Sequence, residues 1–217
     1  FRSPVVNFTT ANVCESQSAT FTDASTSAAG DPIISWYWDF DDTNTSTAQN
    51  PSNVYAVSNT YDVSLFVATA FCSNSDTVPI TVEPNPTAVF TEDVVAGCTP
   101  LTVNFTNATT GATAYLWDYA DGTTATSQDP SHAFVNSGTT DTVFTIQLIA
   151  NTAFGCTDTA TGDITVYPSA VAGFNHNAVT GCAPMDVTFV NTSTGGTSYS
   201  WGFGDATGST AQHPVHT

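Results

Sequence analysis

The sequence of 217 residues contains no lysine and only one arginine, Arg2, so basic side chains are almost absent. Its 19 acidic residues give a formal net charge of −18 at pH 7. Nucleic acids and anionic membranes are negatively charged, and the proteins that bind them carry clusters of basic residues. We therefore expect no nucleic-acid partner and no attraction to an anionic membrane.

Long apolar runs are missing as well. The longest are interrupted by Thr, Asn and Asp, and they fall short of the roughly 20 residues that cross a bilayer as a helix. We therefore expect no membrane insertion. Residues 1–3 do not have the pattern of a signal peptide, so any such peptide is expected to have been removed or to lie further upstream.

The sequence also lacks the motifs of common catalytic sites. It has no Gly-x-Ser-x-Gly nucleophile motif and no lysine that could act as a base or a nucleophile. Its Asp residues recur at matching positions of an internal repeat, whereas a catalytic residue is needed only once. We predict that the chain is not an enzyme.

What the sequence does contain is a tryptophan motif that occurs three times. Each copy has a Trp, an aromatic residue two positions later, and then a turn with Asp. Alternate residues of a strand share a face, so both aromatic side chains are expected in one core, beside a turn that the Asp residues stabilise. The motif residues are Trp38, Asp39 and Asp42, then Trp117, Asp118 and Asp121, and finally Trp201 and Asp205.

The five cysteines follow the same period. Cys14, Cys98 and Cys182 are 84 residues apart, and so are Cys72 and Cys156. The first and second cysteines of a copy are 58 residues apart in both cases, so we predict the disulfides Cys14–Cys72 and Cys98–Cys156. Paired cysteines indicate an oxidising compartment, and hence a secreted or cell-surface protein.

The period divides the chain into three domains. Residues 1–85 and 86–169 are two complete domains, and residues 170–217 are the N-terminal half of a third. Proline-containing connectors at residues 83–86 and 167–170 separate them. Because Pro restricts its own backbone and that of the preceding residue, we expect stiff connectors and a rod of domains.

The third domain lacks its second cysteine, so the partner of Cys182 is predicted to lie outside the chain. Half a sandwich would also leave Phe189, Trp201 and Phe203 without an opposing sheet. Either the native polypeptide continues or a neighbouring chain donates the missing strands. Continuation is the simpler of the two, because it also supplies a partner for Cys182.

Strands are predicted by alternation of apolar and polar residues. The clearest runs are residues 61–67 in the first domain and residues 101–106 and 144–148 in the second. About seven short strands per domain, separated by turns with Gly, Asn, Asp and Pro, predict an all-β fold built from antiparallel sandwiches.

The tryptophan motif, followed by residues 129–134 and an alternating strand, resembles the PKD repeat. Residues 50–55 and 213–216 stand at the equivalent places of the other two domains. The resemblance implies tandem immunoglobulin-like β-sandwiches of the kind found in surface adhesins, in large bacterial exoproteins and as spacers in secreted hydrolases. Three features depart from the PKD pattern. Its usual Gly after the second aromatic residue is replaced by Asp41 and Ala120, Gly202 stands in the third domain where the second has Asp118, and paired cysteines are not part of the pattern.

Polar residues of the turn suggest two roles. Asp39, Asp41 and Asp42 are candidate calcium ligands, because calcium prefers hard oxygen donors. We expect no other cofactor. The alternative is that Asp42 and its counterparts accept backbone N–H bonds within the turn. His132 and His216 follow a proline by two residues in matching positions, and we predict a structural role for both.

Trp36 occurs in the first domain only, and an exposed ring at this place would be a candidate carbohydrate contact. Packing at a strand edge is the alternative. Asn-x-Ser/Thr sequons also make the chain a candidate glycoprotein. They begin at Asn7, Asn44, Asn104, Asn107 and Asn191.

These features predict a structural, adhesive segment of a large bacterial surface or secreted protein, acting as a stalk or an extracellular filament. Its partners would be neighbouring repeats of the same or of identical chains, together with surface glycans or proteins. The alternative is a spacer or a carbohydrate-binding accessory module of a secreted hydrolase.

Overall fold

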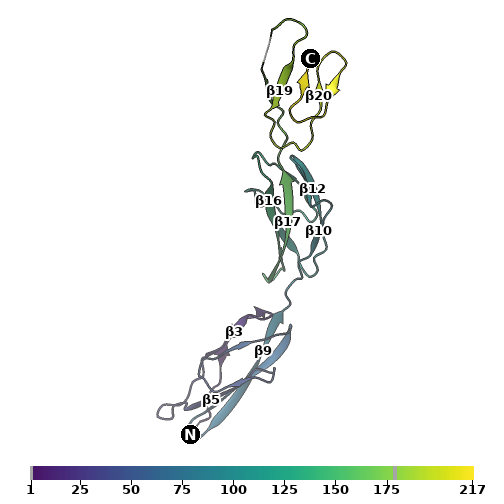
Figure 1. Cartoon of the computed structure of the whole chain (residues 1–217). Coiled ribbons are helices and arrows are strands. Elements are labelled where there is room, and N and C mark those ends of the chain that lie inside the picture. The colour runs from purple at the N-terminus through teal and green to yellow at the C-terminus, as the bar shows by residue number, and fades with distance from the viewer. Residues whose placement is uncertain (1, 178–179) are drawn as a thin grey trace. The chain divides into compact units, whose positions relative to one another are not determined.

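The computed structural model describes residues 2–177 and 180–217, which form strands, turns and loops (Figure 1). These residues include no helix, so none could span a membrane. Backbone packing divides the chain into two compact units. One consists of Phe1–Val89, Thr109–Tyr115 and Ile149–Thr159, and the other of Phe90–Ala108, Leu116–Leu148 and Ala160–Thr217. The all-β prediction is confirmed.

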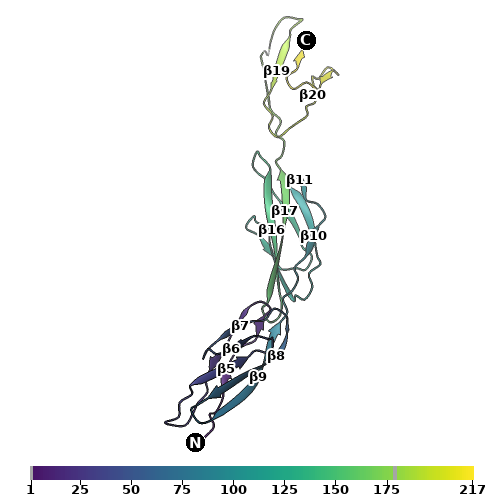
Figure 2. The same ribbon diagram turned by 60° about the horizontal axis from the view of Figure 1, so that its bottom comes forward.

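The first domain has one five-stranded sheet, in the order β2-β9-β8-β5-β6, and the two smaller sheets β1-β4 and β3-β7. Figure 2 shows β5, β8 and β9 side by side. Its strands are β1 Phe8–Thr9, β2 Val13–Cys14, β3 Ser18–Thr20, β4 Thr22–Asp23, β5 Ser35–Asp39, β6 Thr45–Ser46, β7 Ser52–Val54, β8 Asn59–Ala68 and β9 Ser73–Glu83.

The second domain repeats this arrangement, with a five-stranded sheet β11-β17-β16-β13-β14 and a three-stranded sheet β10-β12-β15. In both domains the first cysteine lies in a short strand that pairs in parallel with the last strand. The strands are β10 Phe90–Glu92, β11 Ala96–Cys98, β12 Leu101–Asn107, β13 Ala114–Asp118, β14 Thr124–Ala125, β15 Ser131–Phe134, β16 Thr142–Asn151 and β17 Thr157–Tyr167.

The third domain contains counterparts of only part of this pattern. A three-stranded sheet β18-β19-β22 corresponds to β10-β12-β15, and the pair β20-β21 corresponds to β13-β14. Residues 170–217 hold no counterpart of β16 or β17 among the described residues. The strands are β18 Phe174–His176, β19 Val187–Asn191, β20 Trp201–Gly202, β21 Gly208–Ser209 and β22 Val215–His216.

The alternating runs bury one face, as the sequence predicts. In β8 the side chains of Val63, Leu65 and Val67 are fully buried, whereas Phe66 between them is exposed. In the first domain these aliphatic residues pack in one core with Trp38 and its aromatic neighbours. The hydrophobic effect of this burial holds the sheets of the domain together.

Candidate functional site

Each Trp of the repeated motif is tied to the loop that follows it. The indole Nε1 donates a hydrogen bond to the backbone oxygen of the residue ten positions later. The pairs are Trp38 with Ala48 at 2.9 Å, Trp117 with Ser127 at 3.0 Å and Trp201 with Ala211 at 2.8 Å. Such a bond lets a Trp be buried without leaving its polar N–H group unsatisfied.

The turn after the Trp contains a residue with left-handed backbone geometry in every domain. The φ angle is 60° at Asp41, 58° at Ala120 and 88° at Gly204. This geometry costs a residue other than Gly about 1–2 kcal/mol. In the first two domains an Asp side chain two positions earlier accepts the backbone N–H of the strained residue, at 3.0 Å from Asp41 and 2.9 Å from Ala120.

Gly204 in the third domain needs no such support, because Gly adopts this positive φ without strain. Gly202 stands there in place of the supporting Asp. The two departures from the PKD pattern at this turn are therefore linked. Asp39 and Asp118 stabilise a backbone that Gly would adopt freely.

Replacing Ala120 with Gly should therefore raise the free energy of unfolding of the second domain by about 0.5–1 kcal/mol, after the greater flexibility of Gly in the unfolded chain is subtracted. Urea denaturation measures this change. The matched control is Ala114→Gly in strand β13, which should lower the stability, because Gly weakens a strand. A loss of stability in Ala120→Gly as well would contradict the strain argument.

The Asp four residues after each Trp forms a clamp with the turn and with a neighbouring strand. One carboxylate oxygen accepts the backbone N–H of the residue two positions later, and the other contacts a side chain from β7, β15 or β22. These contacts join Asp42 to Asn44 at 3.0 Å and Asn53 at 2.7 Å, Asp121 to Thr123 at 2.9 Å and His132 at 2.7 Å, and Asp205 to Thr207 at 2.9 Å and His216 at 2.9 Å.

The two His rings also stack on the second aromatic residue of the motif. The ring centroids are 4.0 Å apart for His132 and Tyr119, and 4.2 Å apart for His216 and Phe203. Each imidazole thus connects the Asp turn to an aromatic side chain of the core. This arrangement is a structural clamp.

The clamp lowers the pKa of the Asp121 and Asp205 carboxyl groups. At Asp205 the hydroxyl and backbone N–H of Thr207, followed by His216, lower the pKa to about 2. Burial of Asp121 acts in the opposite direction, but hydrogen bonds from Thr123 and His132 still leave its pKa below the ordinary value. A lowered folded-state pKa stabilises the fold above the unfolded-state pKa, and this contribution is lost as the pH falls toward 2.

Titration of the Asp205 carboxyl group by NMR should therefore show a midpoint near pH 2. Thr207→Val removes the hydroxyl donor and should move the midpoint up toward the ordinary value of 3.8. An identical midpoint in both proteins would show that Thr207 does not set the pKa.

The candidate calcium site is not present in the structure. The carboxylate of Asp41 accepts a hydrogen bond from the backbone N–H of Asp62. The carboxylates of Asp39 and Asp42 accept hydrogen bonds from backbone N–H groups of the turn, and that of Asp42 also accepts one from the side chain of Asn53. Within residues 2–177 and 180–217, no three acidic, His or Cys side chains are grouped so that they could hold a metal ion. The carboxylates diverge because each satisfies backbone or amide donors nearby.

Trp36 is not the exposed platform that a sugar contact requires. It is only partly exposed and packs against the core of the first domain. Its indole Nε1 donates a hydrogen bond of 2.7 Å to the carboxylate of Asp23. Trp36 instead packs at a strand edge, which is the alternative that the sequence suggested.

The cysteines pair differently from the prediction. The structure contains a disulfide between Cys14 and Cys156, which are 142 residues apart and have a Cα–Cα distance of 5.6 Å. Cys72, Cys98 and Cys182 are free thiols. The bond therefore joins the first domain to the second, and the predicted pairs Cys14–Cys72 and Cys98–Cys156 are wrong.

The length of the last strand explains the error. Cys14 pairs with Glu83 at the end of β9, whereas Cys72 directly precedes the start of that strand. The 11 residues of β9 separate these positions by roughly 35 Å at the usual rise per residue. A disulfide requires a Cα–Cα distance below about 7 Å. The same geometry separates Cys98 from Cys156 along β17.

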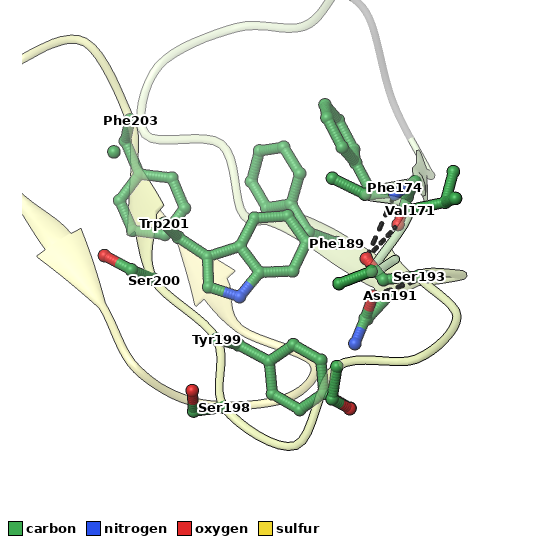
Figure 3. Close-up of a pocket in the computed structure, with 15 residues that line it drawn as sticks. Val171, Phe174, Phe189, Asn191, Ser193, Ser198, Tyr199, Ser200, Trp201 and Phe203 are labelled. Carbon is green, nitrogen blue, oxygen red and sulfur yellow. Dashed lines mark hydrogen bonds between the residues drawn. The ribbon is translucent and has the colours of Figure 1, made fainter. Parts of the chain in front are cut away.

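An open aromatic groove lies on the third domain. It has a volume of about 490 Å³, and Trp201 lies at its centre with Phe189, Phe203 and Tyr199 around it (Figure 3). Trp38 and Trp117 are fully buried, but Trp201 is partly exposed, and 54% of Phe174 is exposed. The sequence predicted this exposure for Phe189, Trp201 and Phe203. It did not single out Phe174 or Tyr199.

Comparison with known proteins supports the repeat. The family described as PKD domain matches residues 2–83 and again residues 81–166. Comparison with curated proteins found no match. Among solved structures, the PKD1 domain of the Vibrio cholerae metalloprotease PrtV is 28% identical, with 38% of this chain and 99% of that chain covered and a TM-score of 0.34.

Two further structures illustrate the range of similarity. The PKD1 domain of Vibrio anguillarum Epp is 27% identical, and its TM-score is 0.35. This match covers 38% of the present chain and 96% of the Epp domain. The I-band fragment I67–I69 from titin is 12% identical, and its TM-score is 0.44. This match covers 97% of the present chain and 82% of the titin fragment. On the two tandem family matches, which together span more than half of its length, the chain belongs to the PKD domain family.

Proposed function

We propose that this chain is a non-catalytic, load-bearing segment of an extracellular repeat protein, part of a stalk or filament that serves adhesion. Its membership in the PKD domain family and its tandem all-β domains support this role. A disulfide is typical of extracellular compartments. The net charge of −18 would keep neighbouring stalks apart by repulsion.

The Cys14–Cys156 disulfide is the observation that carries the proposal. A force applied to both ends of the chain reaches Cys14, crosses the disulfide to Cys156 and continues through β17. Residues 15–155 lie off this path, so they cannot be extended while the bond is intact. The bond therefore limits how far the first two domains lengthen under load.

Single-molecule pulling from the two termini tests this mechanism. Reduction of the disulfide should add about 500 Å to the extended length, because 142 residues become extensible at about 3.5 Å each. Cys72→Ser is the matched control, since it removes a free thiol and should leave both lengths unchanged. Equal extended lengths with and without reductant would refute the load-bearing bond.

The role as a carbohydrate-binding accessory module is tested separately on a glycan array. Trp36 is held by Asp23 and by the core, so the array should show no signal that depends on it. Binding that disappears in Trp36→Ala, while the melting temperature is unchanged, would favour the accessory role over the stalk.

A further inference from the structure

We propose that the outer face of the five-stranded sheet in the first domain binds a neutral polysaccharide. Tyr37 in β5 and Phe66 in β8 stack on the flat faces of sugar rings, and hydroxyl groups of β8 and β9 bond to the sugar hydroxyls. The site deepens the adhesive part of the proposed function and rests on it, because it names the chemical class to which the segment adheres. It is separate from Trp36, which points to the opposite face of β5.

Two aromatic side chains lie side by side on this outer face. Tyr37 and Phe66 are directly opposite each other in the antiparallel pairing of β5 with β8. The Cβ atoms of such a pair are about 5 Å apart. Tyr37 is 47% exposed and Phe66 is 43% exposed, whereas Trp38, the next residue of β5, is fully buried on the inner face. Two adjacent rings therefore present more apolar surface than the single exposed side chains that are normal on a protein.

Hydroxyl groups border the two rings. Ser75 in β9 lies directly opposite Phe66, and Ser64 and Thr77 form the next pair on the same face. The hydroxyl oxygens of Ser64 and Thr77 are 2.9 Å apart. A hydroxyl group both donates and accepts hydrogen bonds. A sugar ring has the matching composition, because its flat face carries C–H groups and its rim carries hydroxyl groups.

Charge decides between the possible partners. The net charge of −18 opposes an acidic polysaccharide and a second copy of this chain. The acidic side chains of this face are Asp39 and Asp62. Asp39 accepts the backbone N–H of Asp41, and Asp62 lies four residues from Phe66 along β8, which is about 13 Å. A basic peptide on the rings would therefore place its charges beside uncharged hydroxyl groups and lose their hydration. A neutral ligand complements these surroundings.

Extended chains of β-linked glucose have the shape that this face requires. All ring substituents of β-glucopyranose are equatorial, so both faces of the sugar ring carry only C–H groups. Consecutive rings of an extended chain can therefore lie on Tyr37 and Phe66 together. The hydroxyl groups at the rim of the sugar then point toward the serine and threonine side chains of the sheet.

The second domain lacks the aromatic pair and serves as an internal comparison. Leu116 directly precedes Trp117, as Tyr37 directly precedes Trp38, so Leu116 and Tyr37 occupy equivalent places. Leu116 is 37% exposed, but it has no ring that could stack on a sugar. The site is therefore confined to the first domain.

Calorimetric titration of the full oxidised chain with cellohexaose, a neutral oligosaccharide of β-linked glucose, tests the proposal. Tyr37→Thr and Phe66→Thr should each lower the affinity about tenfold, because each removes one stacking ring and keeps a residue suited to a strand. Tyr37→Phe keeps the ring and should bind like the parent. Leu116→Thr is the matched control and should also leave the affinity unchanged. Equal melting temperatures show that a variant retains the fold.

Three outcomes would overturn the proposal. The first is that the parent does not bind cellohexaose, or that both Thr variants of the first domain bind it as the parent does. The second is that octa-arginine binds in preference to cellohexaose and is lost in the same variants, which would assign the face to a basic protein segment. The third is a dimer in light scattering that the same variants abolish, which would assign the face to a second copy.

The load-bearing role is tested apart from this site. Single-molecule pulling depends on the bond between Cys14 and Cys156 and not on the two rings. A chain that lengthens on reduction but does not bind cellohexaose would retain the stalk and lose the glycan site. A chain that binds cellohexaose but has equal extended lengths with and without reductant would retain the glycan site and lose the load-bearing bond.

Discussion

Replacing Trp117 with Ala should lower the free energy of unfolding of the second domain by roughly 3–5 kcal/mol. The indole is fully buried, and its ring centroid lies 5.1 Å from Phe90 and 5.3 Å from Phe105. The substitution also removes the hydrogen bond to Ser127 and leaves a large cavity. A loss of this size is most of the stability expected of a small domain.

Thermal and urea unfolding measure this effect. The transition of the second domain should shift strongly or disappear, whereas the first domain keeps its own core around Trp38. Leu116→Ala is the matched control, because Leu116 adjoins Trp117 in β13 but is 37% exposed, and its loss should cost less than about 1 kcal/mol. One undiminished cooperative transition in Trp117→Ala would contradict the assignment of this residue to the core.

Loss of the disulfide should have an effect of similar size. The double variant Cys14→Ser/Cys156→Ser should lower the free energy of unfolding by about 5 kcal/mol, because the bond closes a loop of 142 residues in the unfolded chain. Removing both cysteines avoids a new free thiol. Denaturant unfolding of the oxidised proteins measures the change.

The matched control for this variant is Cys72→Ser, which changes a thiol outside the disulfide and should alter the stability by less than about 0.5 kcal/mol. Equal stability of the double variant and the parent would show that the bond does not constrain the unfolded chain.

The fold was predictable from sequence because each signal is local. The alternation of apolar and polar residues at Val63, Leu65 and Val67 follows from the two-residue period of a strand. All three side chains are buried in the structure. The recurring Trp and Asp residues likewise mark a turn that is built within a few residues. Such patterns depend on backbone geometry, which a single strand and its turn already contain.

The disulfide was not predictable in the same way. A period of 84 residues makes the separation of 58 within a domain and the separation of 142 between domains equally regular. Regular spacing therefore cannot distinguish the two pairings. The disulfide pairing is decided by the position of Cys72, which directly precedes a strand of 11 residues. The far end of that strand pairs with Cys14.

Two candidate sites, calcium at the Asp turn and a sugar contact at Trp36, depend on contacts that the sequence does not show. The sequence shows that Asp39, Asp41 and Asp42 are close together along the chain, but it does not show which donors each carboxylate meets. Asp62 from β8 and Asn53 from β7 satisfy two of them. The bond between Trp36 and Asp23 likewise joins two strands that only the folded sheets bring together.

The most direct test of this account is a disulfide map of the oxidised chain. Trypsin is unsuitable because Arg2 is the only basic cleavage site, so pepsin at acid pH is used, which also suppresses thiol exchange. We predict one linked peptide pair containing Cys14 and Cys156, with Cys72, Cys98 and Cys182 recovered as free thiols. Recovery of Cys14 linked to Cys72 would contradict the covalent connection between successive domains.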